Sequence, residues 1–128
     1  MRVRPAGHLI FVLVILAVGA CGGLMPQAQP ENAPLRVENT QMFITVENRS
    51  GLALREVTIE IVPVGRSTDF SIVVPRLDNG DKRDYPLGNF RGREGTPFNL
   101  RVVRPKSVKV KGTNIHNQVV EVEVPWRK

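Results

Sequence analysis

Residues 56–61 read Glu-Val-Thr-Ile-Glu-Ile and alternate polar with apolar side chains at every step. Successive side chains of a β-strand point to opposite faces, so this alternation predicts a strand with one buried and one exposed face. We expect Val57, Ile59 and Ile61 to point into a hydrophobic core. A helix would need apolar residues three or four positions apart, and the stretch lacks that spacing.

The same two-residue spacing recurs on both sides of this stretch. Further strands are expected around residues 42–46, 70–74, 98–102, 108–110 and 120–124, and residues 48–51, 63–65, 78–81 and 92–97 carry turn signals between them. About seven short strands at this spacing are typical of an immunoglobulin-like sandwich. The chain is therefore predicted to be all-β, an Ig-like antiparallel β-sandwich over residues 35–128.

The N-terminal segment is of a different kind. Arg2 and Arg4 precede an unbroken apolar run over residues 9–18, which ends in Gly19 and Ala20. A positive start, an apolar run and small residues at the end are typical of a secretory signal peptide. A membrane-spanning helix needs about 20 apolar residues, more than this run supplies. We expect residues 1–20 to be a signal-peptide helix.

The sequence Val-Gly-Ala-Cys at residues 18–21 resembles the lipobox of bacterial lipoproteins. In that family the thiol receives a diacylglycerol, the signal is cut before the cysteine, and the new amino group is acylated. The resemblance implies that Cys21 is the lipidation site and that membrane lipid is a partner. It also implies a membrane-anchored lipoprotein of the cell envelope; Gly22, in place of Asp, favours the outer membrane if the cell is Gram-negative. The alternative is a cysteine that is discarded with the segment.

Removing residues 1–20 takes two of the 18 basic residues, leaving a 108-residue chain with 16 basic and 12 acidic residues. That length suits one domain, and the mild positive excess does not indicate a nucleic-acid partner. Cys21 is the only cysteine, so no disulfide can form within one chain. Residues 22–34 are rich in Gly, Pro, Gln and Asn, and we expect a flexible, disordered linker there.

Two longer stretches resemble small bacterial Ig-like envelope domains, including FxLYD-type modules. They are VENRSGLALREVTIEIV at residues 46–62 and VPRLDNGDKRDYPL at residues 74–87, although the FxLYD signature itself is absent. In such domains Asn-x-Ser-Gly leads into a Leu-x-x-Val-x-Ile strand, and a Leu-x-x-Gly-Asp turn precedes another strand. The resemblance implies a binding or structural module and no enzyme.

Three residues are candidates for binding. Arg91 and Arg93 lie between glycines in FRGREGTP, residues 90–97, and arginine forks suit phosphate and carboxylate groups. Lipid headgroups or cell-wall polymers are conceivable ligands, and a solvated loop is the alternative. Trp126 could be a carbohydrate-stacking platform, or it could close one end of the core.

A run of lysines has a structural explanation. If residues 107–111 fold back on residues 120–124, Lys109 lies opposite Glu123 and Lys111 opposite Glu121. The basic stripe would then be neutralised by its neighbouring strand.

The sequence contains no recognisable catalytic or metal-binding motif. Residues 78–81, Asp-Asn-Gly-Asp, predict a hairpin turn and do not match the calcium-loop pattern. His116 is the only histidine after residue 20, too few for a zinc site, and no serine has a nucleophile-elbow context. We therefore expect no enzyme, no cofactor and no metal. The expected function is a non-enzymatic protein-interaction or structural module with an envelope protein partner; the alternative is a binder of anionic cell-wall polymer or another small ligand through end loops.

Overall fold

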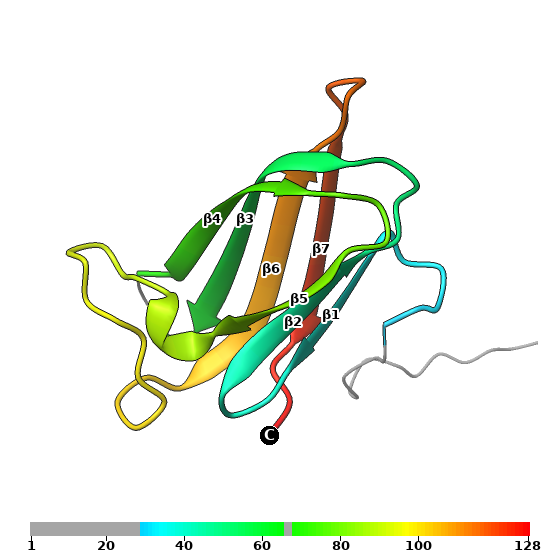
Figure 1. The fold of residues 1–128 in the computed structure, drawn as a ribbon. Coiled ribbons are helices and arrows are strands. Elements are labelled where there is room, and N and C mark those ends of the chain that lie inside the picture. The colour runs from blue at the N-terminus through cyan, green and yellow to red at the C-terminus, as the bar shows by residue number, and fades with distance from the viewer. Residues whose placement is uncertain (1–28, 66–67) are drawn as a thin grey trace, which may run out of the picture.

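The computed structural model describes residues 29–65 and 68–128, which form two antiparallel β-sheets packed face to face (Figure 1). The predicted signal peptide and Cys21 lie outside the described residues. No helix in residues 29–65 or 68–128 is long and apolar enough to cross a membrane. The elements are β1 (Leu35–Asn39), β2 (Phe43–Asn48), β3 (Leu54–Pro63), β4 (Phe70–Leu77), β5 (Lys82–Pro86), the 3₁₀ turn η1 (Leu87–Asn89), β6 (Pro105–Thr113) and β7 (Val119–Pro125).

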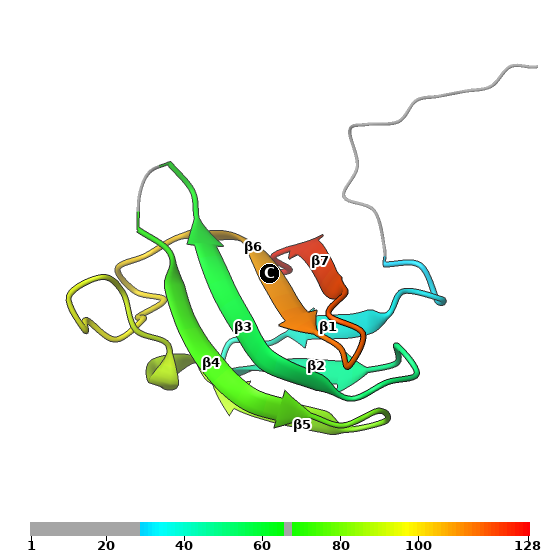
Figure 2. The ribbon, with the colours of Figure 1, turned by 90° about the horizontal axis from the view of Figure 1, so that it is seen from above.

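The strands are ordered β1-β2-β5 in one sheet and β4-β3-β6-β7 in the other (Figure 2). The chain crosses between the sheets after β2, β4 and β5, which gives the Greek-key connectivity of an immunoglobulin-like sandwich. In the constant-type immunoglobulin domain the fourth strand pairs with the fifth; here β4 pairs with β3 instead. The predicted all-β sandwich of about seven strands is confirmed.

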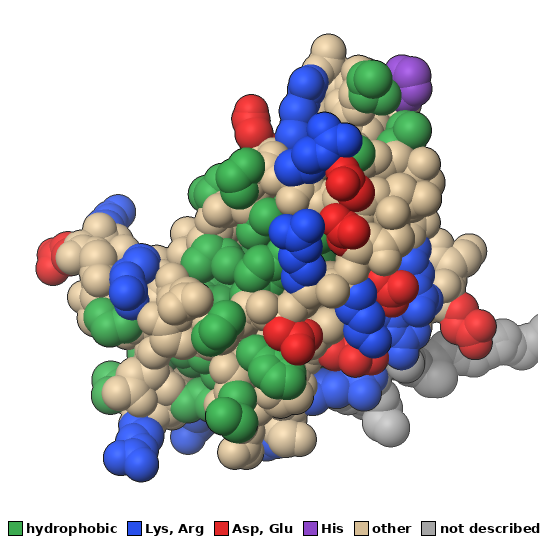
Figure 3. Space-filling model, in the orientation of Figure 1, with side chains coloured by type: hydrophobic (Ala, Val, Ile, Leu, Met, Phe, Trp, Pro, Cys, Tyr) green, Lys and Arg blue, Asp and Glu red, His purple; other side chains and the backbone are tan. Residues whose placement is uncertain are grey.

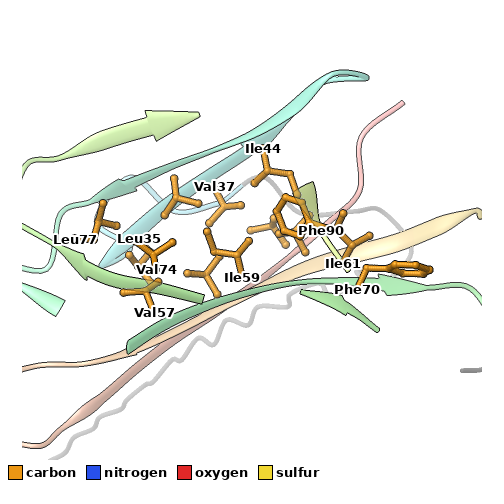
Figure 4. Packing of buried hydrophobic residues seen from close by; sticks show 14 of the residues in the cluster. Leu35, Val37, Ile44, Val57, Ile59, Ile61, Phe70, Val74, Leu77 and Phe90 are labelled. Carbon is orange, nitrogen blue, oxygen red and sulfur yellow. The ribbon is translucent and has the colours of Figure 1, made fainter. Parts of the chain in front are cut away.

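The core lies between the inner faces of the two sheets. Val57, Ile59 and Ile61 of β3 are fully buried, as their spacing predicts, and point toward Ile44 and other side chains of the opposite sheet (Figure 4). Burying side chains of this size contributes about 1.5–3 kcal/mol each relative to exposure. The alternation of β3 is therefore what fixes which face of this strand joins the core.

The predicted strand at residues 98–102 is wrong. Phe98 is buried, but Asn99 begins a turn in which its backbone carbonyl accepts hydrogen bonds from the N–H groups of Val102 and Val103, at 3.0 and 2.9 Å. The Asn99 side-chain oxygen also accepts from the N–H of Arg101, at 2.9 Å. Asparagine offers the backbone these local bonds in place of a strand ladder. As a result Val102 is 79% exposed.

The ordered domain begins earlier than Leu35. The Gln29 side chain lies along the outer edge of β1, where its oxygen accepts from the N–H of Val37 at 3.0 Å and its nitrogen donates to the carbonyl of Leu35. The carbonyl of Pro34 accepts from the N–H of Arg49 at 2.8 Å. Residues 29–34, expected to belong to a flexible linker, are thus fastened to the sandwich.

Candidate functional site

One end of the sandwich gathers the turn at residues 98–104, the β1–β2 connection and the C-terminus (Figure 1). Trp126 reaches this end directly from β7. Its backbone N–H donates to the carbonyl of Lys106 at 2.9 Å, which extends the pairing of β6 and β7 by one residue. The strand ladder therefore sets the position of the indole ring.

The Trp126 ring continues a line of aromatic side chains. Its centroid lies 6.3 Å from that of Phe98 at a tilt of 47°, and Phe98 meets Phe70 edge-on at 5.3 Å and 76°. Such aromatic pairs contribute about 0.5–1.5 kcal/mol each beyond the area they bury. Trp126 is half-buried and packs against the core, so it closes this end of the sandwich, and its remaining surface is available to solvent.

That remaining surface lines a hollow of about 470 Å³. Its walls combine apolar and basic side chains: with Trp126 they are Gln41, Leu100, Arg101, Val102, Val103, Arg104, Pro105 and Lys128. We call Trp126, Leu100, Val102, Val103, Arg101, Arg104 and Lys128 the basic end. Figure 3 shows Lys and Arg side chains beside hydrophobic ones at the lower end of the molecule.

The cations of the basic end have no acidic partner in the described part of the chain. Arg101, Arg104 and Lys128 are exposed. The ion pairs shorter than 4 Å among residues 29–65 and 68–128 are Arg36–Glu38, Arg49–Glu47, Arg76–Asp78 and Arg83–Asp81. A hollow lined by several cationic side chains raises the local concentration of anionic ligands. Arginine can also bind a carboxylate through two parallel hydrogen bonds, which lysine cannot.

Arg91 and Arg93 lie away from this hollow. The backbone of Arg91 pairs with Ser71 of β4, through hydrogen bonds of 3.0 and 3.1 Å. Its guanidinium Nη1 donates to the carbonyl of Gly88 at 2.8 Å, so it is partly engaged within the domain. Arg93 is exposed at the turn that follows. Neither of them lines the hollow beside Trp126.

Sequence reasoning identified Trp126 but missed Arg101, Arg104 and Lys128. Residues 101–106, Arg-Val-Val-Arg-Pro-Lys, contain three basic residues within six positions. Assigning part of this stretch to a strand concealed the cluster. The Asn99 turn would have been the signal that the stretch forms an exposed loop.

The lysine stripe is arranged as predicted. β6 and β7 pair with Lys109 opposite Glu123 and Lys111 opposite Glu121. Glu60 of β3 lies opposite Lys109 on the other side. Burial, and then the neighbouring Asp69, raise the pKa of Glu60, while the two lysines oppose that shift.

The remaining polar clusters are turns. Within residues 78–81 the N–H of Asp81 donates to the carbonyl of Asp78 at 3.0 Å, which confirms a turn. The predicted hairpin is wrong, because β4 and β5 belong to different sheets and do not pair with each other. His116 is exposed, and its backbone N–H donates to the Asn114 side chain at 2.8 Å. The residues that the structure describes contain no group of three or more His, Cys, Asp or Glu placed to hold a metal ion.

No protein-family model matches this chain, and no significant similarity to a curated protein or to a solved structure was found.

Proposed function

We propose that this chain is a non-enzymatic binding module of the cell envelope, held at a membrane by acylated Cys21, that engages an acidic protein partner through the basic end. The observation that carries the proposal is the hollow beside Trp126. There, an aromatic face and apolar side chains are flanked by Arg101 and Arg104, which have no acidic partner among the described residues.

The composition of the basic end favours a protein over an anionic cell-wall polymer. Protein interfaces are enriched in Trp and Arg, and their energetic centres are aromatic or Arg side chains in apolar surroundings. Val102 is 79% exposed and lies in the same hollow as Trp126. A polyanion would satisfy the cations and leave this apolar surface uncovered. An acidic segment with an apolar anchor residue would satisfy both.

The lipid anchor supports a partner close to the membrane. Because Gln29 is bonded to β1, the chain between Cys21 and the domain is short. A chain spans at most about 3.6 Å per residue, so those eight peptide steps reach no more than about 30 Å. The partner that fits this limit is a membrane protein or one held near the same surface.

The anchor is tested with Cys21→Ala. In growing cells fed an alkyne-labelled fatty acid, the wild-type chain should take up label and enter the detergent phase. The variant should do neither, because it lacks the thiol that the resemblance identifies as the acylation site. A variant that still partitions with membranes as strongly as the wild type would overturn this part of the proposal.

The binding surface is tested by crosslinking in cells, purification from detergent extracts and mass spectrometry. We compare an Arg101→Ser/Arg104→Ser variant with an Arg76→Ser/Arg83→Ser control, which removes the same charge from exposed surface ion pairs that contribute little to stability. The first should lose a discrete protein crosslink that the control retains. Recovery of cell-wall polymer in place of a protein would favour the alternative function, and equal crosslinking by both variants would exclude the basic end.

A further inference from the structure

Strand β7 has one unpaired edge. It pairs with β6 on one side and forms the border of its sheet on the other. The backbone hydrogen bonds from Trp126 to Lys106 and from Asn114 to Gln118 identify which opposite residues of β6 and β7 are hydrogen-bonded pairs. Since hydrogen-bonded and non-bonded pairs alternate in an antiparallel ladder, the N–H and C=O groups of Glu121 and Glu123 point outward. Among the described residues nothing donates to or accepts from these backbone groups.

Of the three other edge strands, β1 and β4 are blocked, and the five-residue β5 ends in Pro86 and is exposed along most of its length. β4 contains Pro75, which has no N–H to offer. On β1 the Gln29 side chain occupies the N–H of Val37, and the Asn39 amide exchanges two hydrogen bonds of 2.9 Å with the backbone of Arg127. Proline and covering groups are the usual means of preventing strand addition. Between residues 119 and 124, β7 has neither.

An apolar groove runs beside this unpaired edge. It has a volume of about 600 Å³. One wall is Pro30, Ala33 and Pro34, and the other is Val122, Val124 and Pro125. The groove shares no lining residue with the hollow of the basic end. The docked segment 29–34 is thus what gives the edge of β7 a second apolar wall.

The outer face of the same strand carries Glu121 and Glu123, which lie opposite Lys111 and Lys109 of β6 on one side and have no neighbouring strand on the other. Glu121 and Glu123 are exposed, whereas Val122 and Val124 are directed toward the groove side. In an antiparallel addition, side chains directly opposite one another lie about 5 Å apart, and opposite charges stabilise the pair. Residues opposite Glu121 and Glu123 should therefore be basic, and those between them should be apolar.

We propose that β7 accepts an extended segment of a partner protein in which apolar residues alternate with Lys or Arg. The backbone of this segment pairs with Glu121 and Glu123, its apolar side chains enter the groove, and its basic side chains face the two carboxylates. A second copy of β7 is a poor occupant, because in-phase pairing would place glutamates opposite glutamates. This surface is additional to the basic end and does not depend on it.

The test uses the full-length chain in detergent micelles and a fluorescently labelled peptide, Lys-Val-Lys-Val-Lys-Val-Lys, followed by anisotropy. Glu121→Pro removes one outward N–H and leaves the pairing with β6 intact, so affinity should fall about tenfold or more. Glu121→Lys should cause a similar loss through like-charge repulsion. Glu94→Lys makes the same charge change on an exposed loop and should leave the affinity unchanged.

Two further peptides separate the contributions of the groove and of the charges. Lys-Ser-Lys-Ser-Lys-Ser-Lys should bind much more weakly, because it has nothing to bury in the groove. Glu-Val-Glu-Val-Glu-Val-Glu should not bind the wild type and should bind Glu121→Lys better. The proposal is overturned if neither Glu121 variant weakens binding of the Lys-Val peptide, or if the Lys-Ser peptide binds as tightly. It is also overturned if sedimentation shows that the chain dimerises and that Glu121→Pro abolishes the dimer.

Discussion

The side-chain amide of Asn48 joins the two sheets, donating a hydrogen bond of 2.9 Å to the carbonyl of Leu77. Asn48 ends β2 in one sheet and Leu77 ends β4 in the other. The same nitrogen donates to the carbonyl of Leu52 at 2.9 Å, and the amide oxygen accepts from the N–H and the hydroxyl of Ser50, at 2.9 and 2.7 Å. Asn48 is fully buried, and both ends of its amide are satisfied.

Asn48→Asp should therefore destabilise the domain strongly. The new side chain has the same shape, but its carboxylate cannot donate to Leu77 or Leu52 and places a charge beside their carbonyls. Losing partners of buried polar groups costs about 1–3 kcal/mol, and more when a charge is involved. Urea unfolding followed by circular dichroism measures the loss. Asn89→Asp, at an exposed position, is the control and should change stability little.

The loss should shrink at acid pH, where the carboxyl group introduced by Asn48→Asp is protonated and can again donate one hydrogen bond. Equal stability of Asn48→Asp and the wild type at neutral pH would show that the amide does not hold the sheets together.

How much of this could be read from the sequence differs between elements. The strands with alternating side chains were predictable, and so was the register of β6 on β7, because a slip of one residue would turn every valine outward. The apolar spacing did not predict β5, since Lys-Arg-Asp-Tyr-Pro has no apolar alternation, and only the resemblance to Ig-like modules implied a strand after residues 77–81. It is a strand because it pairs with the open edge of β2. Strand preference depends on such neighbours more than on the residue itself.

The candidate site was predicted only in part, for a similar reason. Trp126 is fixed by the strand that precedes it, and its terminal position is visible in the sequence. Arg101 and Arg104 lie beside Trp126 because Asn99 forms a turn. The apolar spacing of residues 98–102 indicated a strand and did not reveal this turn. The burial of Asn48 was equally hidden, since residues 48–51 predict only a turn.

A second prediction concerns the irregularity in β3. Arg55 lies opposite Thr113 and Thr58 opposite Lys111, so Glu56 and Val57 share Gly112 as their partner on β6. Glu56 accordingly adopts a φ of +51°, as occurs at β-bulges. A Cβ atom on Gly112 would lie 3.1 Å from a Val57 methyl group and 3.2 Å from the Cβ of Leu54, tighter than ordinary contact.

Gly112→Val should consequently destabilise the domain by about 1–3 kcal/mol, the usual cost of overpacking a core. Gly112→Ala should cost less than that. Thermal unfolding of the purified chain gives the comparison. Gly88→Ala is the matched control, because a Cβ there meets nothing within 4 Å and the backbone is not left-handed. It should be neutral or slightly stabilising, and a loss as large as that of Gly112→Val would refute the packing argument.

A third prediction concerns the hydroxyl group of Tyr85. It is buried and has no hydrogen-bond partner among the described residues. Removing an unsatisfied buried group relieves its desolvation cost, so Tyr85→Phe should be neutral or stabilise the domain by up to about 1 kcal/mol. Urea unfolding at neutral pH tests this. A destabilisation of similar size would mean that the hydroxyl group is bonded in solution.

Tyr85 should also affect stability at alkaline pH. Burial raises the pKa of its phenol, so in the unfolded chain this group ionises first, near pH 10. The free energy of unfolding is unaffected by this group below that pH and falls as the pH rises above it, because the unfolded state then binds fewer protons than the folded state. Tyr85 is the only tyrosine, so its ultraviolet absorbance reports the titration directly. Tyr85→Phe should lack this part of the alkaline loss.

The last prediction concerns Glu60 on the outer face of β3. Its pKa is raised, first by burial and then by Asp69, despite the opposing effect of Lys109 and Lys111. The folded state therefore disfavours the ionised form, and stability from Glu60 is lost as the pH rises from the ordinary glutamate range through the raised pKa. Glu60→Gln should thus stabilise the domain at neutral pH, by less than about 1 kcal/mol because the site is largely solvated.

The difference between Glu60→Gln and the wild type should vanish in acid, where Glu60 is protonated in both folded and unfolded states. Urea unfolding at a series of pH values measures this difference in the free energy of unfolding. The control Glu94→Gln, on an exposed loop, should differ from the wild type by the same amount at every pH. If Glu60→Gln is instead less stable at neutral pH and the gap closes in acid, attraction to Lys109 outweighs burial. The charge ladder across β3, β6 and β7 would then stabilise the sheet at this position.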